Sequence, residues 1–284
     1  MTFTEQKRAL AVAVQAAQAA GRLMRRHLAS DKKINSATQH DIKLELDVRC
    51  QKLIERTLHA AFPGIAVLGE EGVLGDPQSA RRWVVDPIDG TVNFTYGIPH
   101  ACVSIALQVG SQESEIRSRK RAHPDDAYQT LVGVVYDPFL DELWTAIRGQ
   151  PARLNGKIIH VSRRGKLAEA IVAMGFAKDQ TTLAKMLPIF HALVPRVRKI
   201  RLLGAAALSM TWVAAGRMDA YQECGIRLWD IAAGGLIVEC AGGEFWRRPI
   251  AGEHAYELCV SNGRLRRQLE KVWKSASANS GVRR

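Results

Sequence analysis

An apolar segment that runs directly into two carboxylates places the strongest constraint on this chain. The segment is WVV at residues 83–85, and DPIDGT follows it at residues 86–91. A short apolar run bounded by turn residues is typical of a buried strand. Burial disfavours the ionised form of a carboxylate unless a cation or a hydrogen-bond donor compensates it. We therefore expect a buried strand that ends where the charges of Asp86 and Asp89 are balanced.

Two other apolar runs also lead into acids. Glu70-Glu71 follows IAVL, and Asp230 follows IRLW. Carboxylates at strand ends converge at the rim of a sheet, where ligands bind, and a bound cation relieves their mutual repulsion. The set offers only oxygen ligands, with no His or Cys at metal-binding spacing. We therefore expect Mg²⁺ before Mn²⁺, and not zinc.

The turn after Asp86 also supplies main-chain groups. The proline and glycine of DPIDG make the turn tight, so the Ile88 carbonyl can face the same way as the carboxylates. Gly90-Thr91 opens a predicted helix, TVNFTYG, whose first N–H groups can bind an anion. A metal beside such N–H groups is what a phosphate ester requires. The alternative is that the two aspartates are only a turn residue and a helix cap.

Helical and strand patterns alternate along the chain. Helices are expected over residues 5–28, 45–62, 183–197 and 204–216, and from Asp230 to Gly242-Gly243. Strands are expected within residues 65–72, 81–91, 100–110, 131–138, 142–149, 166–176 and 219–225. This mixture favours a layered α/β or α+β enzyme over a bundle or a barrel. Residues 29–39 are expected to be a polar linker, 111–129 a charged protruding loop, and 276–284 a disordered tail.

Composition limits the class of protein. The chain has 284 residues, of which 47% are hydrophobic, and a formal net charge of +12, which favours anionic partners. Its basic residues form short clusters with few aromatics between them, which disfavours a dedicated nucleic-acid surface. Five cysteines without a CxxC pair indicate thiols of a reducing compartment. No apolar run is long enough to span a membrane, and the N-terminal pattern favours an amphipathic helix over a signal peptide, so a cytoplasmic protein is expected.

Three segments resemble the signature segments of the inositol monophosphatase family, the Mg²⁺-dependent, lithium-sensitive phosphatases. These are GEE, DPIDGTVNF and WDIAAGGLIVECAGG, in the family's order and at similar separations. The resemblance extends from about residue 5 to 270. It implies an αβαβα layered sandwich, a homodimer, and two or three Mg²⁺ ions, with Mn²⁺ as a substitute. We expect one catalytic domain over residues 1–275, with lobes of about 1–150 and 151–270.

The resemblance also implies roles for single residues. The side-chain metal ligands are matched by Glu70, Asp86, Asp89 and Asp230, and the main-chain ligand by the Ile88 carbonyl. Gly90 and Thr91 match amides that bind the phosphate. The Thr91 hydroxyl, with Glu70, matches the group that positions the attacking water. Asp47 matches a carboxylate that supports this threonine, and Glu223 matches a contact to the substrate hydroxyls.

Two segments depart from the family's pattern. In DIKLELD, Leu44 stands where the family favours threonine. Ser36 stands where it has a lysine, so we hypothesise that Lys43 supplies this charge. In RLLGAAALS, Leu202 and Ala205 replace hydroxyl residues near the substrate. Fewer donors for sugar or inositol oxygens put myo-inositol 1-phosphate in doubt as the natural substrate.

The expected function is Mg²⁺-dependent hydrolysis of a small phosphorylated alcohol, with inositol monophosphate as the default substrate and a water activated by metal as the nucleophile. The two aspartates are three residues apart, whereas phosphatases that form an aspartyl-phosphate use D-x-D. Histidinol phosphate, a sugar bisphosphate and 3′-phosphoadenosine 5′-phosphate are alternatives, because the metal residues read the phosphate and not the alcohol. An alternative of another class is an RNA- or protein-binding regulator on the same fold, which the net charge permits.

Overall fold

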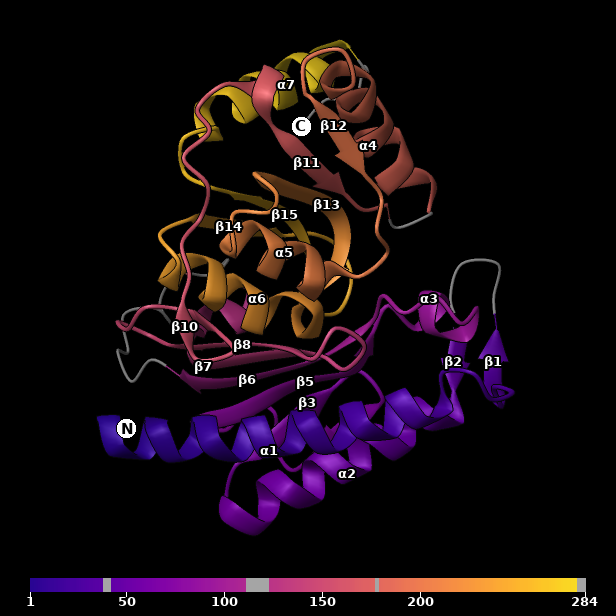
Figure 1. Cartoon of the computed structure of the whole chain (residues 1–284), viewed down its shortest axis with the longest axis vertical. Helices are drawn as coiled ribbons and strands as arrows, with labels where there is room; N and C mark the ends of the chain where they lie inside the picture. Colours follow the sequence, from indigo (N-terminus) through magenta and orange to yellow (C-terminus); the bar gives the residue numbers. More distant parts are fainter. Residues whose placement is uncertain (38–41, 111–122, 177–178, 280–284) are drawn as a thin grey trace.

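Two large β-sheets and three layers of helices make up most of the part of the chain that the structure describes. The structure is a computed structural model, and it describes residues 1–37, 42–110, 123–176 and 179–279. Within these ranges the strands form an eight-stranded sheet, a five-stranded sheet and a two-stranded hairpin. Helices cover the outer face of each large sheet and fill the space between the two sheets (Figure 1). The predicted αβαβα sandwich is confirmed.

The eight-stranded sheet carries the segment that ends in the two aspartates. Its order is β10 (Lys157–Ile158), β9 (Arg153–Leu154), β8 (Glu142–Ile147), β7 (Tyr128–Asp137), β6 (Cys102–Gly110), β5 (Arg81–Asp89), β3 (Ala66–Gly69) and β4 (Gly72–Leu74). All neighbours are antiparallel except β3 and β5. In that parallel pair Gly69 lies opposite Val85, so Glu70 and Asp86 leave the sheet at the same edge.

The five-stranded sheet has the order β12 (Lys199–Arg201), β11 (Ile171–Met174), β13 (Ala220–Arg227), β15 (Ala255–Ser261) and β14 (Glu244–Pro249). Strand β11 is parallel to both of its neighbours, and β15 is antiparallel to both of its own. Strands β1 (Ile34–Ala37) and β2 (Ile42–Leu44) form the separate hairpin.

The helices differ in how much of their surface is apolar, according to their layer. Amphipathic α1 (Phe3–His27) and α2 (Glu45–Ala61) cover the outer face of the large sheet, and α4 (Gln180–Leu193) and α7 (Arg266–Asn279) cover that of the small sheet. Helices α5 (Ala206–Ala214) and α6 (Leu228–Cys240) lie between the sheets and are buried almost all round. A helix that is packed on both sides needs apolar residues all round, which AALSMTWVA and LIVEC supply. Among the described helices, none is both long and apolar enough to cross a membrane.

Among the predicted boundaries that were wrong, four concern the loops, the C-terminal tail and the start of α6. The predicted loop 111–129 ends earlier, because Pro124–Ala127 form a 3₁₀-helix and β7 begins at Tyr128; residues 111–122 lie outside the described ranges. Helix α7 continues to Asn279, inside the predicted tail, while 280–284 lie outside the description. The predicted linker 29–39 contains β1. Helix α6 begins at Leu228 and not at Asp230, since the acid occupies the third helical position.

Candidate active site

The end of β5 holds both predicted aspartates in a buried turn. Asp86 accepts the N–H of Ile88 on Oδ1 at 3.0 Å, an Asx-type turn that Pro87 accommodates. The pairing of β5 with β6 shifts register between Asp86 and Asp89, so the irregular part of the strand is Pro87 and Ile88. Gly90 follows with φ of +93°, and a Cβ there would lie 2.9 Å from the His100 carbonyl oxygen. The turn therefore requires glycine for its conformation and for space.

Asp89 caps a helix that lies far away in the sequence. Its Oδ1 accepts the N–H of Ala206 at 3.0 Å, and its Oδ2 that of Ala207 at 2.8 Å. These are the first two residues of α5, whose N-cap residue Ala205 offers no side-chain acceptor. Burial raises the pKa of Asp89 to about 6, and the two N–H groups oppose that rise. Sequence reasoning missed this contact, although a predicted helix that opens with GAAA and no capping side chain was its signal.

Glu70, Asp86 and Asp230 converge with Asp89. Glu70 donates its backbone N–H to Val85 at 3.1 Å, which fixes it beside β5. Burial raises the pKa of Glu70 well above its ordinary value, and the charge of Asp230 adds to the rise. Burial and the charge of Glu70 do the same for Asp86. The charges of Glu70, Asp89 and Asp230 each raise the pKa of Asp86, so the fully ionised group is unfavourable unless a cation neutralises it.

Asp230 and Asp47 are held by the same kind of hydrogen bond at the start of a helix. Each is the third residue of its helix and reaches back to the N–H of the residue before the helix. Asp230 Oδ2 accepts from Arg227 at 2.9 Å, and Asp47 Oδ2 accepts from Leu44 at 2.8 Å. Burial raises the pKa of Asp230 to about 7, with a further rise from the charge of Asp89. The charge of Asp47 raises the pKa of Glu70, which places Asp47 at the edge of the same acidic group.

The other predicted residues lie around this group. Thr91 is the first residue of α3 (Thr91–Thr95), and its hydroxyl donates to the Ile88 carbonyl at 2.8 Å. That bond draws two predicted groups together, while support of Thr91 by Asp47 stays a prediction. Glu223 on β13 accepts a hydrogen bond from the Tyr221 hydroxyl. Burial raises the pKa of Glu223 to about 8, and the charges of Asp230 and Asp89 contribute. The side chain of Lys43 lies outside the described residues.

The donor chemistry of the acidic group fits a hard divalent cation, because every ligand it offers is oxygen. Within the described ranges, however, no three or more His, Cys, Asp or Glu side chains are arranged to hold a metal ion. Asp86, Asp89 and Asp230 each accept a hydrogen bond from a backbone N–H group. Each carboxylate oxygen has two lone pairs, so these bonds leave acceptor capacity for an ion. The residues therefore fit Mg²⁺, and the detailed coordination stays a prediction.

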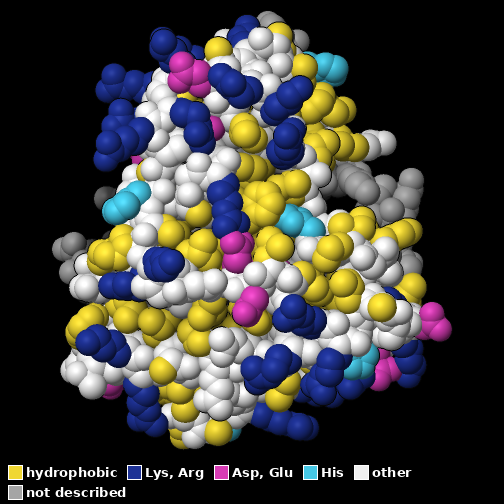
Figure 2. All heavy atoms as spheres, viewed as in Figure 1, with side chains coloured by type: hydrophobic (Ala, Val, Ile, Leu, Met, Phe, Trp, Pro, Cys, Tyr) yellow, Lys and Arg dark blue, Asp and Glu magenta, His cyan; other side chains and the backbone are white. Residues whose placement is uncertain are grey.

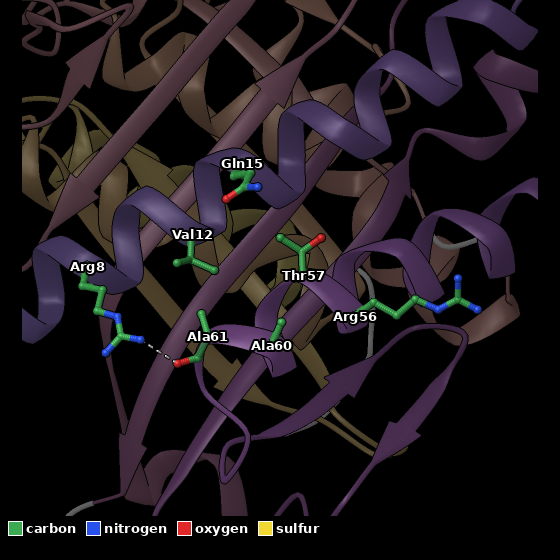
Figure 3. A pocket seen from close by; sticks show the side chains of 7 residues that line it. All are labelled: Arg8, Val12, Gln15, Arg56, Thr57, Ala60 and Ala61. Atoms are coloured by element: carbon green, nitrogen blue, oxygen red, sulfur yellow. Dashed lines mark hydrogen bonds between the residues drawn. The ribbon is translucent and has the colours of Figure 1, made fainter.

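A groove on the outside of the molecule lies apart from this group. It measures about 510 Å³ and lies between α1 and α2 (Figure 3). Arg8 reaches across it and donates to the Ala61 carbonyl at 3.2 Å, while Arg56 points away along α2. None of the predicted site residues lines the groove. On the face of Figure 2, Lys and Arg side chains are spread out and not gathered in one patch.

Comparison with known proteins decides the family. The sequence model of the inositol monophosphatase family matches residues 5–116 and 126–275. The chain belongs to the inositol monophosphatase family. The match omits residues 117–125, which fall in the charged segment before β7.

Individual relatives support the assignment and bear two kinds of name. The chain is 36% identical over 241 residues to Inositol monophosphatase 1 of Solanum lycopersicum, covering 82% of each chain. It is 38% identical over 280 residues to the Nus factor SuhB of Xylella fastidiosa, covering 94% of each chain. Membership of the family supports a phosphatase, and the second name indicates that members also have other roles.

Solved structures of the family have the same fold. The extragenic suppressor protein suhB of Bartonella henselae superposes with a TM-score of 0.79 at 32% identity, over 93% of this chain and 97% of that one. The IMPase of Thermotoga maritima also gives 0.79, at 29% identity, over 94% of this chain and 97% of its own. The likeness therefore extends over nearly the whole chain.

Proposed function

We propose that the chain is a Mg²⁺-dependent phosphomonoesterase that hydrolyses a small phosphorylated alcohol. The observation that carries the proposal is the convergence of Glu70, Asp86, Asp89 and Asp230, whose pKa values are all raised by burial. Such a group destabilises the fold when it is ionised. A role in binding cations would explain why the chain nevertheless carries it. The three signature segments that supply these residues lie within the family match.

Each residue has a distinct part in the proposed reaction. Bound Mg²⁺ would neutralise the phosphate oxygens and make a water more acidic. Asp86, Asp89, Asp230, Glu70 and the Ile88 carbonyl would hold the ions. The N–H groups of Gly90 and Thr91 would bind the phosphate. Glu70 and the Thr91 hydroxyl would orient the attacking water, the Glu70 carboxylate would accept its proton, and Asp47 would support Thr91.

The alcohol would lie against the loop before α5 and against Glu223. Asn93 on α3 donates to the Leu203 carbonyl at 2.8 Å, so this loop is bound to the helix that begins at Thr91. The loop carries Leu202, whose surface is 58% exposed. A leucine side chain offers no hydrogen bond to a substrate hydroxyl, so esters with many hydroxyls and esters with few must be compared directly. We propose inositol monophosphate as the first ester to test, followed by histidinol phosphate, a sugar bisphosphate and 3′-phosphoadenosine 5′-phosphate.

The test is phosphate release from these four esters with Mg²⁺, with EDTA and with added Li⁺, beside Asp230→Asn. Asp230 is preferred over Asp89 because Asp89 also caps α5. An asparagine at residue 230 can still accept the N–H of Arg227, so the fold should survive. We expect Mg²⁺-dependent, Li⁺-inhibited turnover and a fall in kcat of roughly 100-fold or more in the variant.

The matched control is Asp179→Asn. Asp179 also accepts a backbone N–H at a helix start, from Thr182 at 2.9 Å, but it caps α4 on the outer face of the small sheet. It should retain the kcat of the parent. Turnover that persists in EDTA, or full activity in Asp230→Asn, would contradict the proposal.

The relatives named Nus factor SuhB favour keeping a second candidate, an RNA- or protein-binding regulator on the same fold. This role predicts RNA binding that falls steeply with salt and survives in Asp230→Asn. Absence of RNA binding at low salt would exclude an RNA-binding role. A homodimer, a cytoplasmic location and a single catalytic domain over residues 1–275 also remain predictions.

A further inference from the structure

A buried network of charged side chains joins the two large sheets. At its centre is Asp125, in the 3₁₀-helix Pro124–Ala127, whose side chain is fully buried. Its Oδ1 accepts from Arg82 Nη2 at 2.7 Å, and Arg82 lies on β5 of the eight-stranded sheet. Its Oδ2 accepts from the Tyr256 hydroxyl at 2.8 Å and bonds to His254 Nδ1 at 2.7 Å. Tyr256 lies on β15 of the five-stranded sheet, so one carboxylate is bonded to both sheets.

Both carboxylate oxygens of Asp125 have hydrogen-bond partners, and Arg82 has further partners of its own. Arg82 also donates to the side chain of Gln108 at 2.9 Å, and its guanidinium stacks 3.7 Å from the centre of the Tyr128 ring. Burial alone would raise the pKa of Asp125, but hydrogen bonds from His254, Arg82 and Tyr256 hold it well below its ordinary value. Buried ion pairs add little net stability over apolar packing, whereas their directional bonds fix a geometry. A role in geometry is therefore the better explanation for this network.

One arm of the network holds the start of α6. His254 lies in the turn between β14 and β15 with φ of +50°. Its carbonyl accepts the N–H of Leu228, the first residue of α6, at 3.0 Å. Its ring packs on the ring of Trp229, with centroids 6.0 Å apart. The next residue along α6 is Asp230, so the turn that Asp125 holds is bonded to the helical turn that carries this acid.

The other arm is anchored on the strand that carries the remaining acids. Arg82 precedes Asp86 by four residues on β5, which corresponds to about 13 Å of extended chain. Asp86 and Asp89 therefore lie on the same strand as Arg82, which anchors Asp125. The network bridges the strand that supplies two acids and the turn that orients a third.

We propose that Asp125, acting through His254, is a positioning residue that fixes Asp230 relative to Asp86 and Asp89 and thereby sets the affinity of the site for a divalent cation. The inference rests on the proposed function for its cation. Asp125 lies in the stretch that the family match omits, between residues 116 and 126. Its partners Arg82, His254 and Tyr256 lie inside the matched residues.

The experiment compares His254→Phe with Lys185→Met. The first variant keeps an aromatic ring for Trp229 and removes one bond to a buried carboxylate, and Asp125 keeps Arg82. The second also removes one bond to a buried carboxylate, Glu257, which keeps Arg248 at 2.6 Å. Glu257 follows Tyr256 on β15 and so faces the opposite side of the sheet, toward α4. The two changes match in chemistry and differ in whether they touch α6.

Three quantities are measured in each variant and in the parent: Mg²⁺ affinity by calorimetry, amide exchange of residues 228–231, and kcat and KM against Mg²⁺. In His254→Phe we expect faster exchange, a Mg²⁺ dissociation constant raised roughly 10-fold, and a kcat that recovers at high Mg²⁺. Lys185→Met should change none of these. Asp125→Asn leaves residue 254 intact and should repeat the effect, which excludes an artefact of phenylalanine at positive φ.

The inference would be overturned if amide exchange and Mg²⁺ affinity stay at parental values in His254→Phe. It would also be overturned if both change equally in Lys185→Met. The network would then serve only to hold the two sheets together. A parent chain that neither binds Mg²⁺ nor hydrolyses any ester would instead refute the proposed function. The exchange of residues 228–231 would still report, in that case, whether Asp125 positions the start of α6.

Discussion

At residue 90 the chain turns from β5 into α3 through a left-handed conformation. The position is also crowded, since a Cβ would lie 2.9 Å from the His100 carbonyl and 3.3 Å from the Ala101 Cα. Both obstacles are backbone atoms, which cannot move aside as the end of a side chain can. The residues on either side, Asp89 and Thr91, depend on this turn for their positions in the proposed site.

We predict that Gly90→Ala lowers the free energy of unfolding by more than about 2 kcal/mol, since alanine incurs both the left-handed penalty and the clash. Gly97→Ala is the control, because Gly97 has φ of +72° but no atom near the added Cβ. It should cost only about 1 kcal/mol, the left-handed penalty alone. Urea denaturation of both variants measures the difference, and equal losses would show that the clash is absorbed.

At the scale of elements, small residues allow α6 to pack closely against β7. A Cβ on Gly133 of β7 would lie 2.9 Å from the Ala233 carbonyl and 3.3 Å from its Cα. A Cβ on Gly234 of α6 would instead meet the flexible Met210 side chain, at 2.6 Å from its Cε. The strand thus meets the helix backbone directly, and this contact sets how far α6, with Asp230, lies from the large sheet.

We predict that Gly133→Ala destabilises the protein by about 1–3 kcal/mol, because the backbone of α6 must shift to admit the methyl group. Gly234→Ala should be much closer to neutral, since Met210 can change rotamer and alanine favours the helix by up to about 1 kcal/mol. The two midpoints of urea unfolding test this order. If Gly234→Ala were the more damaging change, Met210 would be as rigid as backbone.

At the scale of the whole molecule, the acidic group makes stability depend on pH with an unusual sign. The folded pKa values of Asp89 and Asp230 are raised from 3.8 to about 6 and about 7. The folded protein therefore holds protons that the unfolded chain has released. Stability from these groups is greatest below about pH 4 and is lost as pH rises through their folded pKa values. The usual buried, paired aspartate, such as Asp125, behaves in the opposite way.

We predict that in EDTA the melting temperature falls between pH 5 and pH 8, and that Mg²⁺ restores it at pH 8. Asp230→Asn should melt several degrees above the parent in EDTA at pH 8, because it removes a repulsion on the order of 2–4 kcal/mol. It should also gain less from Mg²⁺. Calorimetry at the two pH values measures this. A parent that melts at the same temperature at both, with and without Mg²⁺, would contradict it.

Local pattern was sufficient to identify most of the elements and the acids of the site. The run WVVDPIDGT identified β5, its tight turn and the start of α3 from residues in direct succession. It was insufficient at residues 111–129, because a charged sequence without periodicity gave no sign that Asp125 is buried. Charge predicts exposure unless a partner is present, and the partner of Asp125 is Arg82, 43 residues earlier in the chain.

By itself the sequence determined which residues are apolar, where turns occur, and which acids follow strands, because these depend on neighbours in the chain. The family and the candidate ligands follow from those short segments. Only the tertiary structure decided that Asp89 caps α5, 117 residues away, and that Asp125 bonds to both sheets. It also decided that the acids lie close enough to raise one another's pKa and that α6 meets β7 through Gly133. These features arise from distances between segments far apart in the chain, and such distances are set by the packing of the two sheets around α5 and α6.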